Sequence, residues 1–564
     1  MSEKKSLNPV VILALIGVFV FVLIYAGMSL TGNIGKNQRV VSTEKAISTM
    51  DRLYDDIIVN NVTPRKEPVS LEQVSIEDSL PDISTYQIKV RNTSPNYIEI
   101  FSSPEKAGEN KDAWLVEVAR EFNRAGIEVG GQRASVQIRS IDSGTGTDYI
   151  TSGKYLPDAF SPSNMLWGKI IEASGQEITL HEERLVGNVA GVLFSKNQYN
   201  EMIDKYGAIN QKVITEAVAA DEIAMGYTNP FASSTGLNFL LSTLYSFDNN
   251  DLLSEKAVNG FESFQLNIPF VAFTTMQMRE SARTGVLDGF IMEYQTYTNS
   301  PDLRSDYVFT PFGVRHDNPI YEIGQLSAVK KEILEKFVEF CKNDKNQRLA
   351  SRYGFNNFDD YKSEMREFEG NVIASGQKLW KEKKDAGTEI ASVFVADVSG
   401  SMDGVPLNKL KESLLTGAQY IGSDNKVGLV TFSSDVNINL PIEKFDLNQR
   451  SYFTGAVKDM RANGSTAMFD AIIVASKMLM EEKENNPDAK LMLFVLTDGD
   501  TNVGHSFNNV RNMLEGLEIP VYTIGYNADI KVLENLSNIN EAASINAATD
   551  DVVYKLKNLF NAQM

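Results

Sequence analysis

Short apolar runs alternate with amphipathic stretches over the C-terminal part of the chain. The apolar runs are typical of buried strands and lie at 391–396, 427–432, 493–497 and 521–525. Apolar residues recur at helical spacing over 407–421, 467–480 and 550–560. A further run at 436–440 has the pattern of an antiparallel strand at the edge of a sheet. Strands that alternate with helices predict a mostly parallel sheet covered by helices, so we expect an α/β domain over 391–564.

A second alternating pattern precedes this one, over residues 91–365. Strand-like runs that end in Ser-, Asp- or Gly-containing turns lie at 97–101, 134–138, 189–194 and 223–228. The chain then returns through 287–294 and closes with helical stretches at 331–340 and 346–355. This order predicts two α/β lobes, the second of which begins near residue 189. Segment 144–147 is expected to be a flexible turn, because no Lys-Ser or Lys-Thr pair follows it as in a phosphate-binding loop.

The segment order over 91–365 resembles a type II periplasmic, or extracellular, solute-binding domain. The closing stretch adds to the resemblance, because a Gln there precedes a helix of small residues and a Gly-Phe end. The resemblance implies two lobes that are joined by a hinge and close on a small ligand. Strand ends and helix N-termini present hydroxyls and backbone N–H groups, which suit anionic groups. By that reasoning the candidate ligand contacts are Ser102, Ser103, Ser143, Ser161, Ser234, Thr235 and Tyr294.

Each candidate Ser also has a purely structural alternative, which is to cap the N-terminus of a helix. We prefer the cluster 233–235 as the ligand contact. Glu293 lies near the expected hinge, where it could bind a cation or an amine, but we expect it to pair with an Arg.

An apolar run long enough to span a bilayer occupies residues 10–30. A cleavable signal peptide would have a shorter apolar core and a small-residue cleavage site, and Tyr25 interrupts that pattern. We therefore expect an uncleaved, single-pass transmembrane helix in the cell membrane. Lys4 and Lys5 precede it and indicate that the tail 1–9 is cytoplasmic and the bulk of the chain extracellular.

Two segments have the composition of linkers. Residues 31–90 are expected to form a stalk, in which an apolar stripe between residues 47 and 58 packs against a neighbour, with self-association as a less favoured use. Segment 63–68 contains two prolines and breaks regular structure. Residues 366–390 are expected to form a second linker with an exposed, Lys-rich helix, in which Trp380 packs at the domain junction.

Oxygen-bearing side chains gather at three points of the C-terminal pattern. Asp397, Ser399 and Ser401 follow the first apolar run at positions i, i+2 and i+4. Later segments add Thr466 at the start of a helix and Asp498 at the end of another strand. In open α/β sheets, ligands bind at the carboxyl ends of the strands. Hard oxygen donors in this arrangement suit Mg²⁺ or Ca²⁺.

These three segments resemble the von Willebrand factor A (VWA) domain and its metal-ion-dependent adhesion site. The family pattern is Asp-x-Ser-x-Ser, then a Thr, then an Asp in a Thr-Asp-Gly context, and this chain fills all five positions. The resemblance implies a Rossmann-like fold with bound Mg²⁺, or Ca²⁺ or Mn²⁺, and an open coordination position for an acidic group on a partner protein. Ser465 is an alternative ligand to Thr466, but the family register favours Thr466.

Composition narrows the range of functions. The chain has 564 residues, 54 Lys and Arg against 74 Asp and Glu, and a formal net charge of −20. This acidity argues against nucleic-acid binding, which needs a basic surface. The single cysteine, Cys341, lies on an apolar helix face and is expected to be buried. His505, Asp403 and Asp500 are expected to be surface residues.

Together these patterns predict an α/β protein with an N-terminal transmembrane helix, a two-lobed solute-binding-like domain and a VWA domain. We expect a bacterial cell-surface binding protein that is not an enzyme. Its VWA domain would bind a protein partner through a divalent cation, and its two-lobed domain would capture a small ligand. The alternative is a ligand sensor or transport accessory that docks to a permease through the VWA domain. A metal-dependent hydrolase is less favoured, because the sequence has no His-Glu-x-x-His motif.

Overall fold

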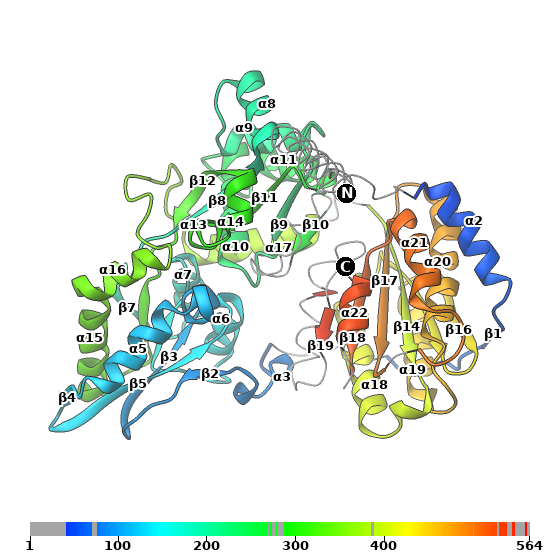
Figure 1. The fold of residues 1–564 in the computed structure, drawn as a ribbon, viewed down its shortest axis with the longest axis horizontal. Helices are drawn as coiled ribbons and strands as arrows, with labels where there is room; N and C mark the ends of the chain where they lie inside the picture. The colour runs from blue at the N-terminus through cyan, green and yellow to red at the C-terminus, as the bar shows by residue number, and fades with distance from the viewer. Residues whose placement is uncertain are drawn as a thin grey trace, which may run out of the picture.

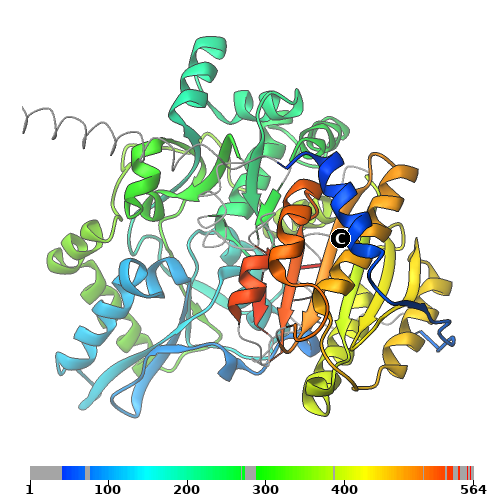
Figure 2. The same ribbon diagram turned by 45° about the vertical axis from the view of Figure 1, so that its right-hand side comes forward.

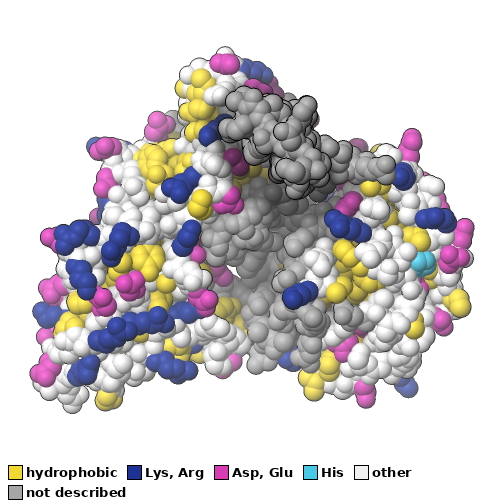
Figure 3. Space-filling model, in the orientation of Figure 1, with side chains coloured by type: hydrophobic (Ala, Val, Ile, Leu, Met, Phe, Trp, Pro, Cys, Tyr) yellow, Lys and Arg dark blue, Asp and Glu magenta, His cyan; other side chains and the backbone are white. Residues whose placement is uncertain are grey.

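The structure, a computed structural model, describes residues 41–69, 76–268, 270–272, 278, 287–384, 388–499, 501–526, 530–537, 544–546, 556 and 559–560. In these residues three β-sheets form two units that lie beside each other (Figure 1). We call residues 76–384 the two-lobed unit. We call residues 41–69 together with 388–560 the C-terminal unit. Lys and Arg side chains gather on one face of the two-lobed unit (Figure 3).

The first lobe is a mixed sheet covered by helices. Its strand order is β2-β5-β3-β6-β13-β7, and β3 runs parallel to β5 and β6. The strands are β2 (Ile88–Val90), β3 (Asn96–Ser102), β4 (Glu128–Val129), β5 (Gln132–Ser140), β6 (Ala159–Ser161), β7 (Ile178–Glu182) and β13 (Ile320–Ile323). The helices are α3 (Ile76–Ser79), α4 (Pro104–Ala107), α5 (Trp114–Arg124), α6 (Ser143–Ser152), α7 (Leu166–Ala173), α15 (Ala328–Lys342) and α16 (Asp344–Arg352).

Segment 144–147 is a helix, so the expectation of a flexible turn is wrong. The segment forms the first turns of α6 and is buried. A side chain at Gly144 would meet the backbone oxygen of Phe231 at 1.9 Å, and one at Gly146 would meet the Phe160 ring at 2.9 Å. Close packing on both sides therefore overrides the low helix propensity of glycine.

The second lobe has the strand order β10-β9-β11-β8-β12. β9 runs parallel to β10 and β11, whereas β8 is antiparallel to β11 and β12. Its strands are β8 (Val189–Ser195), β9 (Met225–Thr228), β10 (Phe270–Ala272), β11 (Gly289–Glu293) and β12 (Tyr307–Arg315). Its helices are α8 (Lys196–Tyr206), α9 (Gln211–Ala219), α10 (Ser234–Phe247), α11 (Glu255–Leu266), α13 (Tyr294–Thr298) and α14 (Pro301–Asp306). The chain returns to the first lobe at β13, so two crossings join the lobes.

Helix α17 (Gly370–Lys383) packs on both lobes and is not the exposed linker helix that its Lys content predicts. Gly370 lies against the backbone of Lys169 in α7. A Cβ at position 370 would stand 1.9 Å from the Lys169 backbone oxygen. Gln377 donates a hydrogen bond to the Pro230 oxygen at 2.8 Å. Trp380 is 0% exposed and donates to the Tyr227 hydroxyl at 2.6 Å, so it packs inside the two-lobed unit and not at the predicted domain junction. One continuous apolar cluster therefore includes residues of α7, α10 and α17.

The C-terminal unit is a seven-stranded sheet with the order β1-β16-β15-β14-β17-β18-β19. The strands are β1 (Val59–Asn61), β14 (Ile390–Asp397), β15 (Lys426–Phe432), β16 (Val436–Lys444), β17 (Lys490–Thr497), β18 (Val521–Gly525) and β19 (Ser544–Asn546). Helices α18 (Val405–Gly417) and α19 (Leu447–Asp459) share one apolar cluster with the sheet. Helices α2 (Thr43–Tyr54), α20 (Met468–Asn485) and α21 (Phe507–Leu517) share another. Helix α22 (Ile530–Ser537) packs beside β18. The expected closing helix, 550–560, lies almost entirely outside the described residues.

The segment that was expected to be a stalk supplies two elements of the C-terminal unit. Ala46, Met50 and Leu53 of α2 are buried against α20 and α21. Strand β1 then pairs in parallel with β16, in the register Val59↔Val436. The prediction that 436–440 is an edge strand is therefore wrong, because β1 covers its outer side. Figures 1 and 2 both show α2, the first described helix, against α20 and α21.

The chain continues from β1 along α19 before it enters the two-lobed unit. The Glu67 backbone N–H donates to the Ser451 oxygen at 3.1 Å. Arg65 forms an ion pair with Asp459 at 3.0 Å. Gly455 allows this approach, because a Cβ there would stand 1.9 Å from the Arg65 oxygen. The two-lobed unit is therefore inserted between β1 and β14 of the C-terminal unit.

No helix among the described residues is long and apolar enough to cross a membrane. The expected transmembrane helix, 10–30, and the cytoplasmic tail, 1–9, lie outside those residues.

Candidate functional site

The two acidic residues of the predicted metal site come from neighbouring parallel strands. Strands β14 and β17 pair in the register Ala396↔Leu496. Asp397 is the last residue of β14, and Asp498 follows the last residue of β17. Both carboxylates therefore leave the sheet at the same edge, as the sequence predicts.

Asp397 is fully buried and held by two hydrogen bonds. Its Oδ2 accepts from the Thr497 hydroxyl at 2.5 Å, and its Oδ1 accepts from the Ser399 backbone N–H at 2.8 Å. The first bond fixes the carboxylate against the neighbouring strand, and the second shapes the turn that follows β14. Thr497 was not among the predicted site residues, although it precedes Asp498 in the Thr-Asp-Gly stretch.

A chain of hydroxyl contacts joins the first loop to Asp498. The Ser399 and Ser401 hydroxyl oxygens are 3.0 Å apart, and the Ser401 hydroxyl donates to Asp498 Oδ1 at 2.8 Å. Ser399 is 1% exposed, whereas Ser401 is on the surface and Asp498 is half-buried. The oxygen atoms thus extend from a buried carboxylate to the solvent.

Backbone hydrogen bonds hold the loop that carries Thr466 against the loop that follows β14. The Gly400 N–H donates to the Gly464 oxygen at 3.0 Å. Thr466 itself is fixed by the loop after β17, because its N–H donates to Asn502 Oδ1 at 2.8 Å. Thr466 is buried at 4% exposure, and the N–H of the alternative ligand, Ser465, donates to the Ser434 hydroxyl at 3.0 Å. Asn502 and Ser434 had no motif signal in the sequence.

The donor set fits a hard divalent cation. Burial raises the pKa of the Asp397 carboxyl above its usual range, and the nearby charge of Asp498 adds to that increase. Burial also raises the pKa of Asp498. Among the described residues, neither carboxylate forms an ion pair with a Lys, Arg or His. A cation would supply the missing positive charge, and carboxylate and hydroxyl oxygens are ligands that Mg²⁺ and Ca²⁺ accept.

Hydroxyl groups are essential to this candidate centre. Within the described ranges, no group of three or more His, Cys, Asp or Glu side chains is placed to hold a metal ion. The site has two carboxylates, so Ser399, Ser401 and Thr466 would have to complete the coordination. His505 is not part of it, because its Nδ1 lies 2.7 Å from Asp470 Oδ1.

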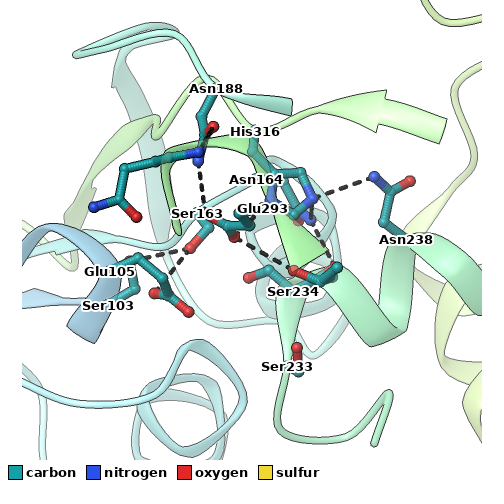
Figure 4. Close-up of polar contacts among 12 residues, drawn as sticks. Ser103, Glu105, Ser163, Asn164, Asn188, Ser233, Ser234, Asn238, Glu293 and His316 are labelled. Atoms are coloured by element: carbon teal, nitrogen blue, oxygen red, sulfur yellow. Dashed lines mark hydrogen bonds and ion pairs between the residues drawn. The ribbon is translucent and has the colours of Figure 1, made fainter. Parts of the chain in front are cut away.

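All the predicted ligand contacts of the two-lobed unit except Tyr294 lie in the region where the lobes meet, and Figure 4 shows Ser103 and Ser234 among them. We call this region the interlobe seam; it is formed by Ser102, Ser103, Glu105, Lys106, Ser143, Gly144, Ser161, Ser163, Asn164, Trp167, Asn188, residues 231–235, Asn238, Glu293 and His316. Trp167 Nε1 donates to the Ser234 hydroxyl at 2.8 Å, and Asn164 Nδ2 donates to the Ser234 oxygen at 3.1 Å. The Gly144 N–H donates to the Ala232 oxygen at 3.2 Å. The two lobes therefore contact each other directly at Ser234, the preferred ligand contact.

Glu293 pairs with a histidine, so the expected pairing with an Arg is wrong. Its Oε1 lies 2.8 Å from His316 Nδ1, and its Oε2 accepts from Asn188 Nδ2 at 2.7 Å. His316 Nε2 in turn lies 3.1 Å from Asn164 Nδ2 and 3.2 Å from Asn238 Nδ2 (Figure 4). Glu293 and His316 are 1% and 0% exposed. Glu293 ends β11 and His316 follows β12, and both strands pair with β8, an arrangement that sequence periodicity does not predict.

A buried Lys and a neighbouring Glu line the first-lobe side of the seam. Lys106 Nζ donates to the Ser103 hydroxyl and to the Ser161 oxygen, both at 2.8 Å. Burial lowers the pKa of Lys106 to about 7. Burial raises the pKa of Glu105 to about 8, and the charge of Glu293 adds to that increase.

The remaining predicted contacts divide into three groups. The Ser102 and Ser161 hydroxyls are fully buried and have no hydrogen-bond partner among the described residues. Ser103, Ser143 and Thr235 are buried in the seam. Tyr294 lies apart from them, because its ring packs edge-on against Phe358 at 4.6 Å and Phe309 at 5.1 Å.

Cys341 is 0% exposed on α15, as predicted, and burial raises the pKa of its thiol.

Residues 393–562 match the family model of the von Willebrand factor type A domain. Among curated proteins, inter-alpha-trypsin inhibitor heavy chain H3 of Bos taurus is 33% identical over 159 residues, which cover 26% of this chain. The match spans only 17% of that relative's length. The von Willebrand factor type A domain of the sequence analysis is therefore confirmed over residues 393–562.

Solved structures resemble each unit separately. A von Willebrand factor type A protein from Catenulispora acidiphila is 18% identical, with a TM-score of 0.28, over 31% of this chain and 42% of that chain. A periplasmic thiamin binding protein is 12% identical, with a TM-score of 0.38, over 52% of this chain and 99% of that chain. Both scores lie below 0.5, so the description of the two lobes rests on their own strand order.

Proposed function

We propose that this protein binds a partner protein through a divalent cation held by Asp397, Ser399, Ser401, Thr466 and Asp498. The observation that carries the proposal is the chain of contacts from the buried Asp397 loop to the exposed Ser401 and the half-buried Asp498. The match of residues 393–562 to a von Willebrand factor type A domain supports it.

In the proposed site each side chain has a separate role. Asp397 supplies buried negative charge and orders the first loop through the Ser399 N–H. Ser399, Ser401 and Thr466 supply hydroxyl oxygens, and Asp498 holds Ser401 in place. A bound Mg²⁺, Ca²⁺ or Mn²⁺ would act as a Lewis acid that accepts a carboxylate oxygen of the partner. The proposed role is binding without turnover.

The test is cation binding by the wild-type chain and two single variants. Isothermal titration with Mg²⁺ and Mn²⁺ is expected to show one site that Asp397→Ala loses, because the only buried carboxylate of the set is removed. Asp403→Ala is the matched control, since Asp403 is an exposed acid six residues later in the same loop. Equal cation affinity in wild type and Asp397→Ala would falsify the site.

The cell-surface location stays part of the proposal and rests on the apolar run 10–30. Membranes from cells that express the full chain should retain it after alkaline carbonate extraction. A variant that lacks residues 10–30 should become extractable. Extraction of the wild-type chain would contradict a membrane anchor.

A second candidate function is capture of a small anionic ligand at the interlobe seam, as in a sensor or transport accessory. The buried Ser102 and Ser161 hydroxyls favour it, because unpaired buried hydroxyls are unusual and a ligand or water would satisfy them. Sulfate, phosphate and acetate are then expected to raise the melting temperature of wild type by mass action. Ser161→Ala should abolish that shift, and no shift with any of the anions would contradict this candidate.

A further inference from the structure

A small polar cavity lies beside the candidate metal site. Its volume is about 290 Å³. Residues 62–64, which follow β1, form one side of it, and Asn437 and Asn439 of β16 form another. We call it the amide cavity. Ligand sites for drug-sized molecules have volumes of roughly 300–1,000 Å³, so this cavity matches a single side chain or a short peptide fragment.

The amide cavity adjoins the metal-site loops. Val398, which lines it, stands between Asp397 and Ser399. Asn463 also lines it and donates its N–H to the Val398 oxygen at 2.8 Å. A molecule in the cavity would therefore be close to a group bound at the cation.

The cavity presents hydrogen-bond donors. Asn439 Oδ1 accepts from the Thr431 hydroxyl at 2.8 Å, and Asn437 Oδ1 accepts from Asn60 Nδ2 at 3.3 Å. These contacts use the carbonyl end of each side chain. Over the described ranges, neither amide NH₂ group of Asn437 or Asn439 donates to another residue, so both can donate to an occupant.

The charges around the cavity favour an occupant with acceptor oxygens. Two charged residues line it, Asp459 and Arg461. Asp459 is already paired, because Arg65 Nε donates to its two oxygens at 3.1 and 3.0 Å. The amide NH₂ groups and the Arg461 guanidinium are hydrogen-bond donors, which a carbonyl oxygen can accept.

We propose that the amide cavity is a second recognition site for the polypeptide that docks on the metal, and that it takes a carbonyl-bearing group. An Asn or Gln side chain near the partner's acidic residue has that chemistry. The inference deepens the proposed function and rests on it. Because residues 62–64 form one side of the cavity, the segment between β1 and the two-lobed unit takes part in partner selection.

The first test examines the cavity without any cation. Saturation-transfer NMR with N-acetylglycinamide as the probe, in EDTA, is expected to show binding to the full chain. Asn439→Asp replaces the donor with a carboxylate and keeps an acceptor for Thr431, so probe affinity should fall about tenfold or more. Asn61→Asp is the matched control, since Asn61 is exposed and does not line the cavity. Thr63→Trp, from the exposed side, should fill the cavity and abolish probe binding.

The outcomes of this test separate the two proposals. Loss in Asn439→Asp and Thr63→Trp, with binding kept in Asn61→Asp and Asp397→Ala, supports the cavity whatever the metal site does. Equal probe binding in Asn439→Asp and wild type, or none in wild type, overturns the inference and leaves the cation measurement unaffected.

The second test joins the cavity to the metal. Peptides with one Asp and one Asn at varied spacing are titrated in Mn²⁺ against peptides with Asp alone. One spacing should bind wild type about tenfold more tightly, and Asn439→Asp should remove that gain. Cation-dependent binding without any preference for Asn would overturn the link. Probe binding without any peptide binding would instead count against the proposed function.

Discussion

The candidate metal-site loops and the interlobe seam both place hydroxyl groups at the ends of parallel strands, but only the first set includes an exposed hydroxyl, that of Ser401. Ser401 is exposed and Asp498 is half-buried in the loops after β14 and β17. In the seam, Ser102 and Ser161 are 0% exposed and Ser234 is 4% exposed. The two regions show that serines at strand ends can either reach solvent or be covered by another part of the chain.

The difference has a physical cause in what packs against each region. In the seam, the second lobe supplies Ser234 and His316 to groups on the first lobe, and α17 packs across both. In the loops after β14 and β17, the Ser401 hydroxyl contacts Ser399 and Asp498 and stays exposed. Four predictions test this contrast, the first three in order of decreasing effect.

Removal of the α17 anchor should have the largest effect. Trp380→Ala deletes a fully buried ring and its bond to Tyr227, which should lower the free energy of unfolding by about 3–5 kcal/mol. Urea denaturation followed by circular dichroism measures it. Lys378→Ala, on the 79% exposed side of the same helix, should change it by less than about 0.5 kcal/mol. Cation affinity should not change, and a loss below about 1 kcal/mol would show that α17 does not hold the lobes together.

Loss of the buried Glu293–His316 pair should cause the second-largest decrease in the free energy of unfolding. Among the described residues, His316→Leu leaves Glu293 with Asn188 and Thr235 as side-chain partners, which should cost about 1–3 kcal/mol in the same urea experiment. His181→Leu is the control, because His181 pairs with Glu322 near the surface, at 18% side-chain exposure. If both variants lose equally, burial of the pair does not explain its contribution.

Removal of the exposed Ser401 hydroxyl should weaken cation binding without lowering the stability of the fold. Ser401→Ala removes one exposed ligand, so Mn²⁺ affinity should fall about tenfold, or about 1.4 kcal/mol, while the cation-free melting temperature stays the same. Titration calorimetry measures the affinity. Thr466→Ala should behave in the same way and Ser465→Ala should not. The reverse result would move the third ligand to Ser465.

The last prediction concerns pH. Folding raises the pKa of Glu105 from 4.5 to about 8, so the native state binds that proton more tightly than the unfolded state. The contribution of Glu105 to stability is therefore present at low pH and is lost as pH rises through about 8. Lys106 has the opposite effect, because folding lowers its pKa from 10.5 to about 7. The contribution of Lys106 to the stability of the fold is present at high pH and is lost as pH falls from 10.5 through about 7. Glu105→Gln should show less loss of melting temperature than wild type between pH 5 and 7, and parallel curves would contradict this.

The closeness of the candidate metal-site residues could be predicted because their signal is local. Asp397, Ser399 and Ser401 lie within five positions, and the strand before them fixes where they emerge. The contacts that position Thr466 and Ser465 could not be predicted, because Asn502 and Ser434 bind their N–H groups from distant positions that have no motif.

Long-range packing explains what sequence reasoning missed. The stripe of α2 predicted a neighbour but could not identify α20 and α21. The Lys residues of α17 indicated an exposed helix, whereas its opposite face is buried on two lobes. Glu293 and His316 meet because β11, which ends at Glu293, and β12, which His316 follows, both pair with β8.

The insertion of the two-lobed unit between β1 and β14 has a consequence for synthesis on the ribosome. Helix α2 leaves the ribosome before the inserted unit, whereas its packing partners α20 and α21 are made only after that unit. Chains fold domain by domain as they lengthen, so the lobes can fold before α20 and α21 are available to pack against α2. The pairing of Val59 with Val436 then closes a very long loop, which is slow because distant contacts form late. The C-terminal unit is therefore the last part of this chain to assemble, although it contains the first described helix.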